Sequence, residues 1–166
     1  MKPFRAARGG ETVARLEPAE ATVVGLLLDQ LEQLLAADAE DVGDDPVLAR
    51  LLPDGHRADP EIAADYRAMT ESALRGGKAD DLAVVRATLP PRGGEVRLDA
   101  DQAAAWLRST NDLRLALGTR LDISDESEPP EEITGDEDQQ LAVYYWLTAL
   151  QGSLVDALVA GRAGRS

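Results

Sequence analysis

Residues 106–121 read WLRSTNDLRLALGTRL, and this segment indicates the fold class more clearly than any other part of the chain. At about 100° per residue, a stripe of mostly apolar residues runs along one side of a helix: Trp106, Thr110, Leu113, Leu117 and Leu121. Arg114 falls beside the stripe with Asn111 just beyond it, and Gly118 leaves room for a guanidinium or a close helix. A guanidinium at the margin of a core needs partners. The segment therefore predicts an amphipathic helix with a polar cluster on one flank.

The polar cluster of Trp106, Asn111 and Arg114 has two interpretations. In the first, Arg114 binds a carboxylate or phosphate of a ligand and Asn111 orients that group. In the second, Arg114 pairs with an acid or a carbonyl of a neighbouring helix and sets the packing register. We expect the second, because charged groups at a core margin are usually paired internally. Arg108 and Asp112 point away from the stripe and are expected to be solvated.

The N-terminal part of the chain predicts a small β-hairpin followed by a helix. Two short mixed segments, 4–7 and 12–16, flank Arg8-Gly9-Gly10-Glu11, and paired glycines between such segments are typical of a hairpin. A helix is then expected over 18–37, where leucines recur at helical spacing after a first-turn proline. The acidic run 38–45 follows as a loop.

The middle of the chain contains two more helix starts. An Asp-Pro pair stands at 45–46 and again at 59–60, where the carboxylate can accept first-turn N–H groups and proline loses no needed donor. The first helix is short, and the second is expected over 60–89. The second is predicted to be kinked or broken at Gly76-Gly77, since each glycine costs about 1 kcal/mol relative to alanine. Residues 95–98 then read as a short strand.

The last helix, expected over 138–160, is apolar nearly all round. Such a helix is either central to the fold or shared with a partner. The sequence therefore suggests self-association as a homodimer, with a candidate interface formed by Tyr145, Trp146, Leu150 and Leu154. No other protein partner can be named from the sequence.

Composition excludes several kinds of chemistry. The chain has 166 residues and no cysteine, which removes disulfides, thiol nucleophiles and thiolate metal sites. His56 is the single histidine, so a multi-histidine metal site or a histidine relay lacks its components, and we expect His56 to be a surface residue in a turn. Paired acids such as Asp80 and Asp81 are expected to be solvated. We predict no metal, no cofactor and no enzymatic activity.

The formal net charge of −14 disfavours nucleic acid and anionic membranes as partners. Neither a signal peptide nor an apolar membrane-spanning run is visible, so we expect a cytoplasmic protein. The first sixteen residues are an exception to the acidic charge, because only one acid stands against Lys2, Arg5, Arg8 and Arg15. A DNA-binding regulator that uses this basic hairpin is therefore an alternative function.

Several segments carry a resemblance that covers nearly the whole chain: DPVLARLLPD at 45–54, Asp59-Pro60-Glu61, the segment 106–121 and YWLT at 145–148. On these segments the chain resembles an uncharacterised actinobacterial family of domains of unknown function, commonly encoded beside the ClpS-type adaptor of the Clp protease. The family has no established activity, so the resemblance implies no catalytic residues, and some members carry a transcription-regulator label. Gly76-Gly77 departs from relatives, in which this helix looks continuous.

We therefore predict a mostly α fold of about five helices in one compact bundle-like domain. It includes the N-terminal hairpin, and the sequence leaves open whether a further short strand forms near Val96. The expected boundaries are a single domain over 1–160 with a hairpin over 1–17 and an acidic mobile loop over 122–138, then a frayed tail over 161–166. The leading function is a non-enzymatic regulatory or interaction protein. The alternatives are DNA binding through the hairpin and binding of a small anion at Asn111 and Arg114.

Overall fold

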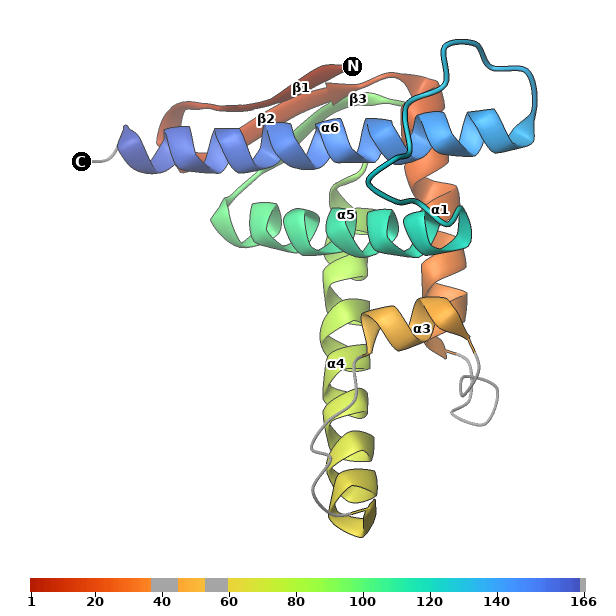
Figure 1. Ribbon diagram of the computed structural model, residues 1–166. Coiled ribbons are helices and arrows are strands. Elements are labelled where there is room, and N and C mark those ends of the chain that lie inside the picture. The colour runs from red at the N-terminus through yellow and green to blue at the C-terminus, as the bar shows by residue number, and fades with distance from the viewer. Residues whose placement is uncertain (37–44, 53–59, 165–166) are drawn as a thin grey trace.

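The computed structural model describes residues 1–36, 45–52 and 60–164, without the side chains of 60–68. Within these ranges five α-helices combine with a three-stranded sheet (Figure 1). The elements are β1 Lys2–Ala6, β2 Thr12–Leu16, α1 Pro18–Ala36, α3 Pro46–Leu51, α4 Pro60–Thr88, β3 Gly94–Leu98, α5 Ala100–Arg120 and α6 Asp136–Ala163. The predicted mostly helical fold with a small sheet is confirmed.

The sheet is antiparallel with strand order β1-β2-β3, so the open question of a third strand near Val96 is answered. A short 3-10 turn at Arg8–Gly10 joins β1 to β2. Gly9 and Gly10 take φ of 76° and 77° there, a region that side chains with a Cβ seldom adopt. The paired glycines thus explain why the hairpin could be recognised from the sequence.

The core lies between one face of the sheet and the helices. Phe4 of β1 contacts Trp106 of α5 edge to face, with ring centroids 5.7 Å apart. The α6 helix runs alongside β1, where the Phe4 amide donates to Ser153 Oγ at 3.2 Å. Almost completely buried side chains come from sheet and helices alike: Leu28, Leu48, Leu82, Val96, Leu98, Trp106, Leu147, Leu150 and Leu154. The last helix is therefore central to the fold.

The α4 helix runs through Gly76 and Gly77 without a break, so the predicted kink is wrong. The segment after the glycines is held in the core, where Leu82 is 1% and Val85 2% exposed. Lys78 adds an ion pair to Asp112 of α5. These tertiary contacts outweigh the weak helix propensity of two glycines, about 1 kcal/mol each.

Two helix ends differ from the predicted ones. The α6 helix continues to Ala163, so the first residues of the predicted frayed tail are helical, and it begins at Asp136 rather than 138. Residues 124–135, from the predicted acidic loop, have mostly exposed side chains. The acidic run 38–44 and the turn with His56 lie outside the described residues.

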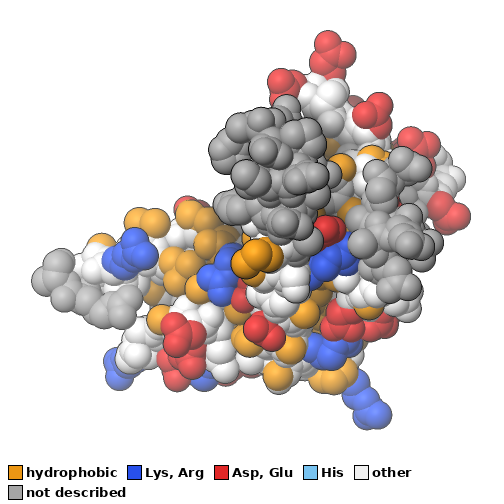
Figure 2. All heavy atoms as spheres, turned by 90° about the horizontal axis from the view of Figure 1, so that it is seen from below, with side chains coloured by type: hydrophobic (Ala, Val, Ile, Leu, Met, Phe, Trp, Pro, Cys, Tyr) orange, Lys and Arg blue, Asp and Glu red, His pale blue; other side chains and the backbone are white. Residues whose placement is uncertain are grey.

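No helix among residues 1–36, 45–52 and 60–164 is long and apolar enough to cross a membrane. On the side of the molecule away from the sheet, basic, acidic and apolar side chains are interspersed rather than gathered in one patch (Figure 2).

Candidate functional site

The α5 helix carries the predicted polar cluster and two further charged residues that form ion pairs with α4. It begins at a capping box, in which Asp99 accepts from the Gln102 amide and the Gln102 side chain accepts from the Asp99 amide. Its predicted stripe is buried, with Trp106 1%, Thr110 3%, Leu113 4% and Leu117 7% exposed. The stripe fixes the rotation of α5, and the polar side chains leave it on two opposite flanks.

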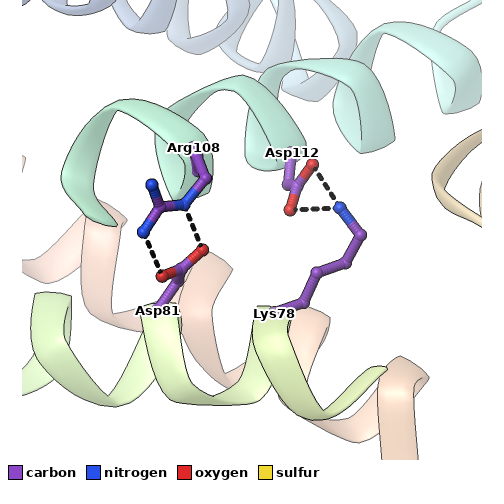
Figure 3. A network of polar contacts seen from close by, with 4 residues as sticks. All are labelled: Lys78, Asp81, Arg108 and Asp112. Atoms are coloured by element: carbon purple, nitrogen blue, oxygen red, sulfur yellow. Dashed lines mark hydrogen bonds and ion pairs between the residues drawn. The ribbon is translucent and has the colours of Figure 1, made fainter. Parts of the chain in front are cut away.

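One flank of α5 faces α4 and carries two ion pairs (Figure 3). Both Asp112 oxygens accept from Lys78 Nζ, at 3.0 and 2.8 Å. Arg108 donates through Nε and Nη2 to the two oxygens of Asp81, at 2.8 and 2.9 Å. The prediction that Asp112 and Asp81 are solvated is wrong, because α4 and α5 cover each other on this flank. Burial raises the pKa of Asp112, which is 8% exposed, and Lys78 only partly offsets that effect.

The three residues of the predicted cluster are not brought together in one site. Trp106 lies in the core, where its Nε1 donates to Thr88 Oγ1 at 2.7 Å. Asn111 accepts from Gln151 Nε2 of α6 at 3.3 Å and borders the hollow beside Lys78. Arg114 borders a different hollow. Trp106 is thus a core residue, and Asn111 cannot orient a ligand bound in the hollow that Arg114 borders.

Arg114 lines a pocket of about 520 Å³ between α3, α5 and α6. A second guanidinium, that of Arg50 on α3, lines the same pocket. Apolar and mixed side chains complete the wall, among them Pro46, Leu115, Ile123 and Tyr144. The pocket therefore combines two cations with an apolar surface, in a volume typical of small-molecule sites.

The Arg114 side chain has no partner within the described part of the chain. Its Nε is buried and lacks a hydrogen bond, and no acid or carbonyl accepts from its terminal nitrogens. A buried donor without a partner costs about 1–3 kcal/mol, more when it carries charge. The described residues thus supply none of the internal partners that we expected for Arg114.

Gly118 brings α6 close to this pocket. A Cβ at this position would lie 3.0 Å from Cε2 of Tyr144. Of the two predicted uses for the space at Gly118, the close helix is the one observed. The Tyr144 ring fills the space above Gly118 and becomes part of the pocket wall.

Lys2, Arg5 and Arg15 lie on the sheet face turned away from the helices, whereas Arg8 lies in the turn, beside the C-terminal end of α6. Lys2 pairs with Arg15 in the register and Arg5 with Val13, while Phe4 and Ala14 point into the core. Lys2, Arg5, Arg8 and Arg15 are exposed, and none of them forms an ion pair with a described residue. The neighbouring Arg97, by contrast, is paired with Glu11 and Glu95.

The candidate interface of α6 divides into buried and half-buried members. Leu150 and Leu154 are 1% and 0% exposed and belong to the core. Tyr145 and Trp146 are half-buried, and Trp146 borders a small apolar hollow against α1. The large apolar residues that α6 exposes are instead Val155 and Val159, which are 41% and 62% exposed.

Sequence reasoning missed Arg50 and Tyr144 as neighbours of Arg114, and Lys78 and Asp81 as partners of the opposite flank. The local pattern does place Arg50 on the outer side of its helix, because Val47, Leu48 and Leu51 form the buried side. No signal in the sequence shows that α3 crosses beside Arg114.

Comparison with known proteins places the chain in a protein family. The model described as "Domain of unknown function (DUF2017)" matches residues 1–158. The chain is 31% identical over 185 residues to proteins named "Oxidative stress regulator AosR" from Mycobacterium tuberculosis and Mycobacterium bovis, covering 96% of this chain and 84% of theirs. It is 32% identical over 182 residues to a "Putative oxidative stress regulator AosR" from Mycobacterium leprae, covering 95% and 83%. No solved structure matches.

Proposed function

We propose that this chain, which belongs to the DUF2017 family of domains of unknown function, is a regulatory protein that acts by binding rather than by catalysis. The observation that carries the proposal is the alignment of 96% of the chain with proteins named as regulators. The geometry supports it, since two guanidiniums and an apolar wall form a surface suited to binding. The gene position beside a ClpS-type adaptor stays a prediction of the resemblance.

Any link to oxidative stress must operate without a thiol on this chain. The relatives are named for oxidative stress, but this sequence contains no cysteine. Reversible oxidant sensing through a thiolate or a disulfide is therefore closed to it. We propose that the chain transmits regulation through contacts, while the oxidant is detected by another molecule. Its most exposed methionine among the described residues is Met69, which lies on α4 and is 75% exposed.

Deletion of the gene in its host tests the proposal. We expect a set of transcripts to lose its normal response to peroxide, and the wild-type gene to restore that response. The variant Met69→Leu should restore it equally, because the proposed regulation does not pass through a sulfur of this chain. Unchanged transcripts in the deletion strain contradict the regulatory role. Failure of Met69→Leu alone contradicts the proposal that regulation does not pass through a sulfur of this chain.

Self-association remains part of the proposal, through the exposed side of α6 that carries Val155 and Val159. Sedimentation velocity should show a dimer that dissociates on dilution, and Val159→Asp should shift the equilibrium toward monomer. A monomer at every concentration removes this element of the proposal and leaves the regulatory role to other partners.

A second candidate, contact with nucleic acid, is favoured by one specific observation. Lys2, Arg5 and Arg15 share the open face of the sheet, and no described acid forms an ion pair with them. A mobility shift of duplex DNA at low salt tests it, with Arg5→Glu and Arg8→Glu as variants. No shift, or a shift that neither variant weakens, rejects this candidate.

A further inference from the structure

We propose that the pocket between α3, α5 and α6 binds a small organic acid, a carboxylate attached to an apolar body. In this arrangement Arg50 and Arg114 receive the carboxylate, and the apolar body lies against the wall formed with Tyr144. The inference names a ligand class and goes beyond the proposed function, because binding can be measured whether or not the chain regulates transcription.

The unpaired state of these two arginines is what first points to an anion. Aspartates and glutamates outnumber lysines and arginines by 31 to 17 in this chain, and some of the other arginines pair with them. Arg86 pairs with Asp29 and Glu32, and Arg108 pairs with Asp81. Arg50 and Arg114 face a shared pocket, and neither forms an ion pair or a side-chain hydrogen bond with a described residue. An anion from outside would supply what the fold does not.

The burial of Arg114 strengthens this argument. Its Nε is shielded from solvent and has no acceptor among the described residues. The terminal nitrogens are not among the buried unpartnered atoms, and Arg114 lines the pocket. A partly desolvated guanidinium attracts a carboxylate more strongly than one in bulk water, and its fork geometry lets it donate to two carboxylate oxygens at once.

The rest of the pocket selects the kind of anion. Its wall is largely apolar, with Pro46, Leu115 and Ile123 beside the Tyr144 ring. Asp122 stands exposed at the same pocket, so a ligand with several negative charges would be repelled there. A single carboxylate on an apolar group satisfies both the cations and the wall. At about 0.15 M salt, the distant acids that make up the charge of −14 are largely screened.

The experiment is a titration of the full chain followed by ¹H–¹⁵N NMR, with phenylacetate as the probe and uncharged 2-phenylethanol as its matched control. The Nε–H resonance of Arg114 reports directly on the site, and its shielding from water favours a sharp signal. We expect a saturable shift of this resonance with phenylacetate and a much weaker response to 2-phenylethanol. Equal responses to the two compounds overturn the role of the arginines.

Variants distinguish phenylacetate binding in the pocket from nonspecific electrostatic attraction to the protein surface. Arg50→Gln and Arg114→Gln should each weaken phenylacetate binding about tenfold or more, the loss of one charge-assisted contact. Arg92→Gln removes the same charge from an exposed arginine outside the pocket and should change binding by less than about twofold. In the Arg114→Gln variant, backbone amides bordering the pocket report binding. Equal affinities in all three variants overturn the proposal.

Two further variants keep both arginines in place. Ala49→Phe adds bulk at the exposed pocket lining and should block phenylacetate while leaving the charges unchanged. Asp122→Asn removes the repelling charge, and asparagine tolerates the φ of 55° at this position, so binding should become about twofold to fivefold tighter. A wild-type protein that shows no saturable shift at any phenylacetate concentration overturns the inference outright.

Discussion

On the flank of α5 that faces α4, Asp112 and Arg108 form ion pairs with Lys78 and Asp81, whereas on the flank that borders α3, Arg114 shares a pocket with a second arginine. Both flanks place charged groups at the margin of the same core. The α4 helix presents a base and an acid that complement α5, and α3 presents a like charge in Arg50. The comparison shows that helix crossing, rather than helix sequence, decides whether a marginal charge is neutralised.

The difference separates two uses of charge. Paired groups between α4 and α5 hold two helices in one register, because a shift of α4 by a turn would leave Asp112 unpaired in a covered position. Arg50 on α3 and Arg114 beside it form no ion pair or side-chain hydrogen bond with a described residue, so their donors are available to a ligand. Stability measurements on variants of both flanks test this distinction.

The largest effect is expected from Lys78→Met. This change leaves the buried Asp112 carboxylate without its cation and should lower the free energy of unfolding by about 2–4 kcal/mol. Chemical denaturation at neutral pH measures the loss. The matched control is Lys2→Met, an exposed lysine that should matter little. Equal stability of the two variants would mean that the Lys78 pair does not hold α4 on α5.

The pH dependence of the same variant adds a test of sign. Because burial raises the pKa of Asp112 above its ordinary value, the folded state holds this proton more tightly than the unfolded chain. The contribution of Asp112 to stability therefore increases as pH falls through its folded pKa, and decreases as pH rises. Removal of Lys78 raises that pKa further, so the loss in Lys78→Met should be smaller at acidic than at alkaline pH. A larger loss of stability at acidic pH would contradict the expected effect of Lys78 on the pKa of Asp112.

A smaller effect is expected from Arg114→Met on the other flank. The variant removes a guanidinium with an unpartnered buried Nε and keeps much of the apolar stem, so unfolding free energy should stay within about 1 kcal/mol of wild type or rise. Thermal and denaturant unfolding measure it. A loss above about 2 kcal/mol would mean that Arg114 is paired within the fold, and the contrast between the flanks would disappear.

The smallest effect belongs to the pair of Arg108 and Asp81, which is the more exposed of the two pairs. The Arg108 side chain is 61% exposed, so Arg108→Gln and Asp81→Asn should each cost less than about 1 kcal/mol. A double-mutant cycle should give a coupling of roughly a few tenths of a kcal/mol that fades as salt is added. A coupling energy as large as the loss of stability in Lys78→Met would show that the strength of the two ion pairs does not depend on their exposure.

Local signals made the elements predictable. The carboxylate of Asp45 accepts from the amides of Val47 and Leu48, and Asp99 forms a capping box, as their positions before helices indicate. Interactions between elements were not predictable in the same way. Asp112 leaves the buried stripe, and only the position of α4 shows that it is covered. Arg114 lies at a core margin where an internal partner is expected, and the neighbour that α3 supplies is another cation.

The contact between Ser153 and β1 has a consequence for solubility. The first strand is an edge of the sheet, and edge strands with free amides can recruit strands of other molecules. The Ser153 hydroxyl accepts from the Phe4 amide, so at this point a helix side chain occupies a position that a foreign strand would need. A three-stranded sheet with such a blocked edge is protected against growth by strand addition on that side.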